Sequence, residues 1–292
     1  MALQTPLTRP WRADVALVLV TVVWGSTFII VKQALDAVGP FVFVAARFWL
    51  AGAALLMAAL VRRETFSRRL VRDGVLTGLC LTMGFVTQTL GLQTTEAGKA
   101  AFITGLSVVL VPPCAALLLR QPPSRAATLG VLLATVGLGL LTLERTLRLT
   151  PGDLWVLACA VGFAGHILST GAFSPRHAVL PFTLVQLLTV AGLTSLAALV
   201  LEARALVPPP GAWLAIGYMG LVATACVFGV QSWAQHHTSP THTALIFALE
   251  PVFAALFAIA IGGEMLASRQ WLGGGLILLG MVAAELGGNR DA

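Results

Sequence analysis

The amino-acid sequence predicts an all-α integral membrane protein of ten transmembrane helices, arranged as an inverted repeat of five plus five helices around a central cavity. Three observations lead to this prediction. The chain of 292 residues is 58% hydrophobic and only 10% charged. Its apolar stretches have the length of membrane spans, and one stretch of the first half matches a later stretch of the second half.

The composition excludes an ordinary soluble domain. A soluble protein has about a quarter of its residues charged, whereas this chain has a mean hydropathy of +0.90. The net charge of +6 could suggest a nucleic-acid partner. However, the basic residues are spread over short loops, and no basic cluster alternates with aromatic residues. We therefore expect a lipid bilayer and a small-molecule substrate as partners, and no nucleic acid.

Four cysteines each lie within an apolar stretch, where a cysteine is usually a small buried hydrophobic residue: Cys80, Cys114, Cys159 and Cys226. None of them has the spacing of a disulfide framework or a metal site, so we expect no metal and no cofactor. The basic N-terminus leads into a full-length span without a clear cleavage site, which predicts a retained first helix rather than a cleaved signal peptide.

Breaks at proline, glycine and charged residues divide the chain into its spans. A helix needs about 20 apolar residues to cross the hydrocarbon core. The spans expected are 14–33, 40–61, 73–93, 98–119, 126–143, 153–173, 180–201, 212–235, 241–262 and 270–287. The short connections leave no room for a soluble domain.

The basic residues predict the side that each loop faces, because cytoplasmic loops carry more Lys and Arg. With the N-terminus inside, the cytoplasmic segments hold eleven basic residues and the external segments hold six. Most of this difference comes from one cluster, Arg62, Arg63, Arg68, Arg69 and Arg72. Both termini are therefore expected in the cytoplasm, and the protein is expected in the cell inner (plasma) membrane with multiple passes.

The internal match predicts two units of opposite orientation. Residues 88–143 align with residues 231–286 at a constant offset of 143. The matched pairs include Gln88 with Gln231, Gly130 with Gly273 and Gly137 with Gly280. Asp14 and Asp153 open the first helix of each unit. Because a unit of five spans is odd, the units 1–149 and 150–292 would face opposite sides of the membrane, as in alternating-access carriers.

Three segments resemble the EamA-type branch of the drug/metabolite transporter superfamily. They are WGSTFIIVK (24–32), Pro40 with Arg47, and ALIFALEPVFAALFAIAIGGEMLASRQWLGGGLILLG (244–280). The third segment is quite specific to the family, and the resemblance covers nearly the whole chain. It implies a ten-helix fold with a central cavity lined by helices 1–4 and 6–9, helices 5 and 10 being peripheral. It also implies export or exchange of small metabolites, often amino acids.

The first copy of the repeat departs from this family pattern. Ser107-Val108 stand where the second copy has Glu250-Pro251, and Gln121 stands where the second copy has Glu264. The two halves are therefore expected to be functionally unequal.

Two charged residues inside spans are candidates for substrate binding, because a charge at that depth is costly. Arg47 lies about 10 Å below the outer end of the second span and could hold a substrate carboxylate. Alternatively, its side chain extends to the surface or pairs with an internal carboxylate. Glu250 lies near the middle of the ninth span, on one face with Phe247, Phe253 and Phe257. It could bind substrate or exchange a proton. It could also bond a neighbouring helix or pair with Arg47, with the Phe stripe facing lipid.

The remaining candidates for the cavity wall are aromatic residues and one histidine: Trp24, Phe28, Phe85, Phe163, His166 and Phe247. His166 could donate to a carboxylate or carry a proton, with a packing role as the alternative. The small residues after Trp24 could instead permit close helix packing.

Gln88 and Gln231 are the candidate gates. They are equivalent in the repeat, yet one is expected near the outer end of helix 3 and the other near the inner end of helix 8. Alternatively, each side chain only bonds a neighbouring helix. Pro251 allows a hinge in the ninth span. His236, His237 and His242 are expected to be solvated loop residues rather than a metal site.

Together these features predict a secondary transporter. It would export small amphipathic metabolites, in the first place amino acids including aromatic ones, by alternating access. No GxxxxGK[ST] motif occurs, so ATP is not the direct energy source. The alternatives are an exporter of drugs or other metabolites, and an intramembrane enzyme. The enzyme would need a nucleophile–base or HExxH motif that the chain does not show, so no enzyme is expected.

Overall fold

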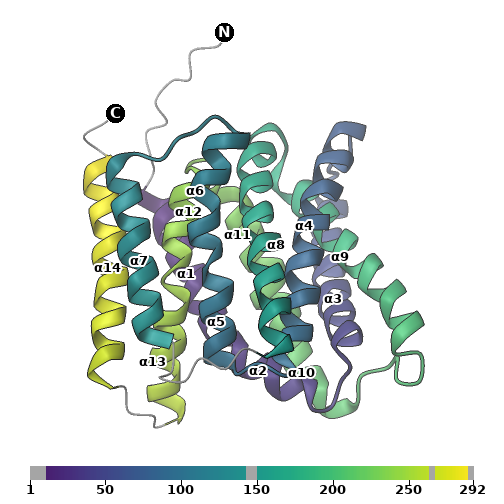
Figure 1. Ribbon diagram of the computed structural model, residues 1–292. Helices are drawn as coiled ribbons and strands as arrows, with labels where there is room; N and C mark the ends of the chain where they lie inside the picture. Colours follow the sequence, from purple (N-terminus) through teal and green to yellow (C-terminus); the bar gives the residue numbers. More distant parts are fainter. Residues whose placement is uncertain (1–10, 143–149, 263–266, 289–292) are drawn as a thin grey trace.

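The computed structural model describes residues 11–142, 150–262 and 267–288, and these ranges contain helices and no strand (Figure 1). The first half contains α1 (Trp11–Gly25), α2 (Thr27–Leu35), α3 (Pro40–Val61), α4 (Arg68–Leu92), α5 (Ala97–Gly105), α6 (Ser107–Leu118) and α7 (Arg125–Thr142). The second half contains α8 (Pro151–Phe173), η1 (Ser174–Arg176), α9 (Val179–Leu201), η2 (Pro210–Ala212), α10 (Trp213–Gly217), the π-helical segment η3 (Tyr218–Cys226), α11 (Val227–Ala234), α12 (Pro240–Phe247), α13 (Glu250–Gly262) and α14 (Ser268–Gly288).

Eight stretches of the described ranges are long and apolar enough to cross a membrane. Each of them coincides with one of the predicted spans, and α1 with α2, α5 with α6, α10 with η3 and α11, and α12 with α13 each form one stretch. The two other predicted spans fall on α7 and α14, which stand beside the bundle at comparable length (Figure 1). An all-helical membrane protein is thus confirmed, while ten crossings remain a prediction.

The local sequence determines where several helices begin. Pro40, Pro151 and Pro240 occupy the first helical turn, where the missing N–H costs nothing. The Ser239 hydroxyl caps α12 by accepting a hydrogen bond from a backbone N–H. At the start of α3, the Glu202 carboxylate accepts two backbone N–H groups at 3.1 and 2.8 Å.

Helix α1 begins and α14 ends at the same end of the bundle, which we call the terminal face (Figure 1). The connections α3–α4, α6–α7, α8–α9 and α11–α12 lie at this face, and the connections α2–α3, α4–α5 and α9–α10 lie at the opposite face. The Arg cluster that includes Arg62 and Arg72 belongs to the α3–α4 connection and its flanks. Since this cluster carries the predicted cytoplasmic signal, the terminal face is the expected cytoplasmic side.

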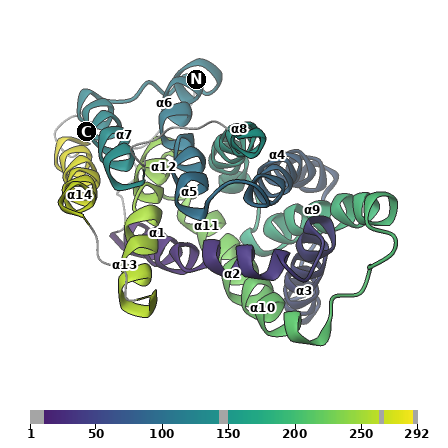
Figure 2. The same cartoon turned by 60° about the horizontal axis from the view of Figure 1, so that its bottom comes forward.

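The two halves of the chain are packed into each other rather than placed side by side. The most extensive contacts join α7 with α14, α4 with α8, and α3 with α9. The proposed boundary between the halves, at residues 149 and 150, falls at the edge of the described ranges. Figure 2 shows α7 and α14 as a pair at one margin of the bundle.

Matched glycines of the internal repeat form the contact between α7 and α14. A Cβ atom added to Gly130 would lie 2.6 Å from the carbonyl oxygen of Gly280, and one on Gly137 would lie 2.5 Å from that of Gly273. The helices therefore run antiparallel and touch backbone to backbone. The contacts are reciprocal, because Gly130 corresponds to Gly273 in the repeat and Gly137 corresponds to Gly280. The sequence match singled out these positions without showing that they touch.

Two helices are interrupted at equivalent positions of the repeat. Leu106 separates α5 from α6, and Ala248 with Leu249 separates α12 from α13. Leu106 corresponds to Leu249 in the repeat, and Ala248, which directly precedes Leu249, has nearly the same backbone angles as Leu106, φ −60° and ψ −14° against φ −61° and ψ −14°. At both points the amide N–H donates to the carbonyl three residues back, which tightens the turn. Pro251 explains only the second interruption, because Val108 stands at its place in the first copy.

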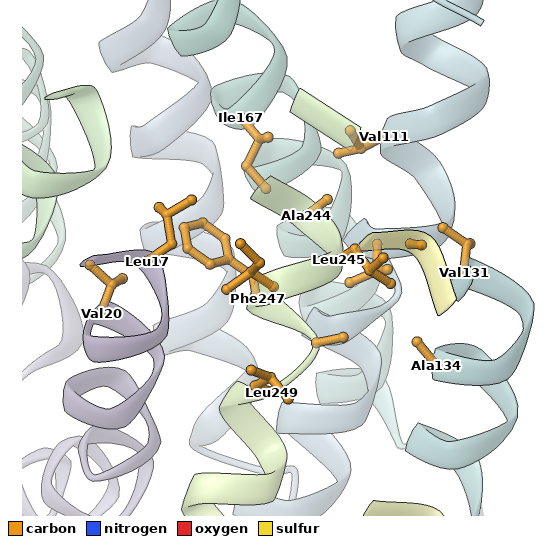
Figure 3. Packing of buried hydrophobic residues seen from close by; sticks show 14 of the residues in the cluster. Leu17, Val20, Val111, Val131, Ala134, Ile167, Ala244, Leu245, Phe247 and Leu249 are labelled. Atoms are coloured by element: carbon orange, nitrogen blue, oxygen red, sulfur yellow. The ribbon is translucent and has the colours of Figure 1, made fainter. Parts of the chain in front are cut away.

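Apolar side chains fill the space beneath α12 (Figure 3). Leu245 lies toward Val111 of α6 and Val131 of α7, whereas Phe247 lies toward Leu17 of α1 (Figure 3). The short helix α12 is therefore held by apolar contacts on both sides, and its polar contacts are at its first turn.

We expect Gly137→Ala to destabilise the fold, because the new methyl group would meet the Gly273 backbone and overpacking typically costs about 1–3 kcal/mol. The matched control is Gly192→Ala in α9, where an added Cβ atom would meet nothing within 4 Å. The thermal unfolding temperature of the detergent-purified proteins measures the effect. It should fall for Gly137→Ala and stay equal or rise for Gly192→Ala, and an equal response of both variants would contradict the close backbone contact.

Candidate functional site

A cavity lies at the centre of the bundle, between helices of both halves. Its wall is formed by side chains of α1 to α6 from the first half and of α8, α11, α12 and α13 from the second half. Helices α7 and α14 contribute nothing to it, as the resemblance implied. Helix α9 was expected to line it and does not, because it packs behind α3 and α4, from where its Gln186 bonds the wall residue His166.

Aromatic rings cover much of the cavity wall. The ring of Phe85 packs against those of Phe163 and Phe228, with centroids 5.2 and 5.9 Å apart. The Trp24 ring lies 5.5 Å from Phe228 and 5.1 Å from Phe247. The Trp24 indole N–H donates to the carbonyl of Ala223 at 3.1 Å, which fixes this ring. Phe28 also lies on the wall.

Arg47 projects from α3 into this aromatic wall and is only 3% exposed. Its Nε donates to the Thr224 hydroxyl at 3.0 Å. Its guanidinium carbon lies 4.7 Å from the Phe85 ring centroid and 5.4 Å from that of Phe48. Among the described residues Arg47 has no carboxylate partner. The structure therefore contains neither the surface-extended side chain nor the internal ion pair considered from the sequence.

The π-helical segment η3 supplies the contact that positions Arg47. A π-helix often marks a functional site, and here the Thr224 hydroxyl donates to the carbonyl of Met219, five residues back, at 2.7 Å. A Cβ atom added to Gly220 would lie 2.9 Å from the Arg47 carbonyl oxygen, so η3 packs closely on α3.

Glu250 begins α13 at the interruption, and its side chain lines the cavity. Among the described residues its carboxylate has no hydrogen bond and no ion pair. The bond to a neighbouring helix and the pair with Arg47 are therefore not formed. Of its expected aromatic neighbours, only Phe247 lines the cavity. Phe253 packs against α1 instead, since a Cβ atom added to Gly25 would lie 2.9 Å from the Cβ atom of Phe253. Gly25 therefore permits close packing of α1 against α13, which is the alternative role that the sequence suggested for the small residues after Trp24.

His166 lies on the wall at the depth expected, but its partner is not a carboxylate. Its Nε2 lies 2.9 Å from the side-chain oxygen of Gln186 and 3.4 Å from the Thr170 hydroxyl. Its ring packs on Phe228 with centroids 5.4 Å apart. This geometry corresponds to the packing role.

Gln88 and Gln231 both line the central cavity. The Gln88 amide donates to the Thr104 hydroxyl at 3.3 Å, and the Gln231 amide donates to Gln235 at 3.1 Å. The Gln231 side-chain oxygen is buried and has no hydrogen-bond partner in the part of the chain that the structure describes, so it can accept a bond from a ligand. A gating role for these two residues stays a prediction.

Sequence reasoning missed several residues of the wall, among them Thr104, Ser107 and Phe228. Phe228 lies one helical turn after Thr224, so the two side chains share one face of the span. This combination of an aromatic and a hydroxyl residue could have predicted that Phe228 lines the cavity. Thr104 and Ser107 flank the interruption at Leu106, which no proline or charge marks in the sequence.

His236 and His237 lie in the α11–α12 connection, whereas His242 lies in the first turn of α12 and is only 7% exposed, so the expectation of a solvated loop residue was wrong for His242. The described residues contain no group of three or more metal-binding side chains. Partial burial, together with the neighbouring His237, lowers the pKa of the His236 imidazole. The motif residues Gly263 and Glu264 lie outside the described residues.

This fold and this cavity define a multi-pass membrane protein with an internal site for a small molecule, and comparison with known proteins gives the family. The model of the EamA-like transporter family matches residues 11–143 and 150–284, so the chain belongs to this family and is a transporter. The resemblance drawn from the sequence and the location in the inner membrane are thereby confirmed.

Three relatives and one solved structure illustrate the similarity. An uncharacterized transporter of Archaeoglobus fulgidus is 32% identical over 94% of this chain and 86% of its own length. The uncharacterized inner membrane transporter YedA of Escherichia coli is 24% identical over 93% of this chain and 90% of its own. An S-adenosylmethionine/S-adenosylhomocysteine transporter of Chlamydia muridarum is 36% identical over 34% of this chain and 32% of its own. A crystal structure that is 20% identical superposes with a TM-score of 0.79 over 94% of this chain and 98% of its own, which shows the fold.

We expect Thr224→Val to destabilise the protein, because it removes the acceptor of Arg47 Nε at a buried position. Hydrogen bonds to charged groups contribute about 1.5–3 kcal/mol. Thr224→Ser retains the hydroxyl and should restore most of the loss. Thermal unfolding of both variants in detergent measures this, and equal unfolding temperatures for Val and Ser would show that the hydroxyl does not hold Arg47.

Proposed function

We propose that this transporter exports small amphipathic zwitterions, in the first place amino acids and molecules that contain an amino-acid group, by alternating access without ATP. The single observation that carries the proposal is that Arg47 and Glu250 line one cavity and that neither has a charged partner among the described residues.

The two charges have a shared chemical logic. A buried charge is costly unless it is paired, and these two side chains do not pair with each other. A ligand with a carboxylate for the Arg47 guanidinium and an ammonium group for the Glu250 carboxylate would pair both at once. Arginine suits the first role, since its planar group can bind a carboxylate through two hydrogen bonds.

The aromatic wall accounts for the apolar part of the ligand. Rings of Trp24, Phe85, Phe163, Phe228 and Phe247 surround the space beside the two charges. They can contact an aliphatic or aromatic side chain, and they can also attract a positive group through their faces. The Chlamydia relative is named for S-adenosylmethionine and S-adenosylhomocysteine, and both compounds contain an amino-acid group, which agrees with the proposed class.

Two features support alternating access. The cavity lies between helices from both halves, and two helices that line it are interrupted at equivalent points, as in carriers whose binding sites are built from discontinuous helices. Within this proposal Gln88 and Gln231 gate the two approaches to the cavity. Ligand movement needs no catalysis, and the short hydrogen bond of His166 goes to the Gln186 side chain, which positions the ring in the wall.

The purified protein in liposomes should move an amino acid down its gradient in the absence of ATP. A panel of neutral, aromatic and sulfur-containing amino acids, S-adenosylmethionine and cationic drugs, each measured with and without an imposed pH gradient, identifies the cargo and the energy source together. Flux of the drugs alone would replace the zwitterion by a cation as substrate class, and no flux of any compound would contradict the proposal.

Arg47→Gln and Glu250→Gln should each weaken transport of the zwitterion, because each removes one of its charged partners. A lost hydrogen bond to a charged group costs about 1.5–3 kcal/mol, which is about tenfold to a hundredfold in affinity. Arg68→Gln makes the same chemical change at the exposed start of α4 and should leave the half-saturating concentration unchanged. If all three variants transport alike, the two charges do not bind substrate.

A further inference from the structure

Two hydrogen-bonded acid–base pairs occupy equivalent positions at opposite ends of the cavity. At the terminal face, His242 Nε2 lies 2.9 Å from Asp14 Oδ1. At the opposite face, Lys99 Nζ lies 2.5 Å from Asp153 Oδ2. The two acids open the first helices of the two repeat units. The two basic residues, Lys99 and His242, are equivalent in the sequence, because they are separated by the same offset of 143 that relates the two copies of the repeat. The sequence indicated the match of the acids but neither of their partners.

Both pairs are well shielded from water. The side chains of His242 and Asp14 are 7% and 23% exposed, and those of Lys99 and Asp153 are 19% and 3% exposed. A shielded pair with a short hydrogen bond is screened less than a surface pair. At the opposite face, the Thr95 hydroxyl also donates to Asp153 at 3.0 Å.

Each pair connects two helices that form the cavity wall. The bases are the third residues of the short helices α5 and α12, whose other end is the interruption at Leu106 or at Ala248–Leu249. The acids are in the first turns of α1 and α8. All four helices contribute side chains to the central cavity. Helix α12 also separates this cavity, which Phe247 lines, from a cleft at the terminal face, which Leu245 and His242 line.

We propose that α5 and α12 are the two moving gates of the transporter, each hinged at its interruption and latched at its first turn by a hydrogen-bonded acid–base pair. The Asp14–His242 pair closes the path from the cavity to the terminal face, and the Asp153–Lys99 pair closes the path to the opposite face. Opening one side requires one pair to separate while the other stays formed. Gln88 and Gln231 line the cavity just inside these moving helices and form the inner part of each gate. This inference rests on the proposed alternating access but not on the identity of the substrate.

Accessibility of the cavity tests the gates without any transport assay. A reporter cysteine replaces Ser107 on the cavity wall, in a chain whose four native cysteines are replaced by alanine. A membrane-impermeant maleimide is applied to intact cells or to inverted membrane vesicles. Asp14→Asn should raise labelling from the terminal face about fivefold or more, the scale of a typical coupling between states, and lower it from the opposite face. Asp153→Asn should do the reverse.

Two further variants separate a latch from a general loss of structure. His242→Gln removes the other partner and should act like Asp14→Asn, whereas the exchanged pair Asp14→His with His242→Asp should restore the original labelling. Labelling that rises equally from both faces, or that does not change, would overturn the inference. If labelling responds as expected in a protein that moves no amino acid, the gates stand and the proposed substrate class fails. If transport occurs while labelling is unaffected, the gates fail and the proposed function stands.

Discussion

The centre of this molecule is governed by the cost of placing charge where there is no water. In the hydrocarbon region a polar group must find its partners within the protein, and a charged side chain adds several kcal/mol to this cost. The protein places Arg47 against the Thr224 hydroxyl and two aromatic rings, which stabilise the guanidinium without neutralising it. Glu250 faces the same cavity without a charged partner among the described residues. The protein retains this unfavourable arrangement, and a ligand that supplies the opposite charges relieves it.

The scaffold around these charges combines symmetry with asymmetry. The reciprocal contacts of Gly130 with Gly280 and of Gly137 with Gly273, together with the matched interruptions, repeat the same geometry in both halves. The side chains at the equivalent interruptions differ, since Ser107 corresponds to Glu250. In the proposed alternating-access cycle this repeated backbone geometry would open the two ends in turn, while the two halves supply different charges to the cavity, Arg47 from the first half and Glu250 from the second.

Hydropathy and the cost of buried charge were enough to predict the spans, Arg47 and Glu250, because both principles act on single segments or single residues. The contacts between distant segments were not accessible in this way. Nothing near Asp14 in the sequence indicates His242, and no proline or charge marks the interruption at Leu106, which follows from tertiary packing. The predicted lining by the seventh span was wrong, since α9 packs behind the wall, and the phenylalanine stripe beside Glu250 divides between the cavity and α1.

The most direct measurement of the central claim is a comparison of ligands that differ by one charge. Binding of an amino acid, its methyl ester and its N-acetyl derivative to the purified protein can be measured by titration calorimetry, with the wild type, Arg47→Gln and Glu250→Gln side by side. The wild type should prefer the free amino acid over both derivatives by about tenfold or more. Arg47→Gln should lose only the preference over the ester, and Glu250→Gln only the preference over the acetylated form. Equal binding of all three ligands to the wild type would contradict the account.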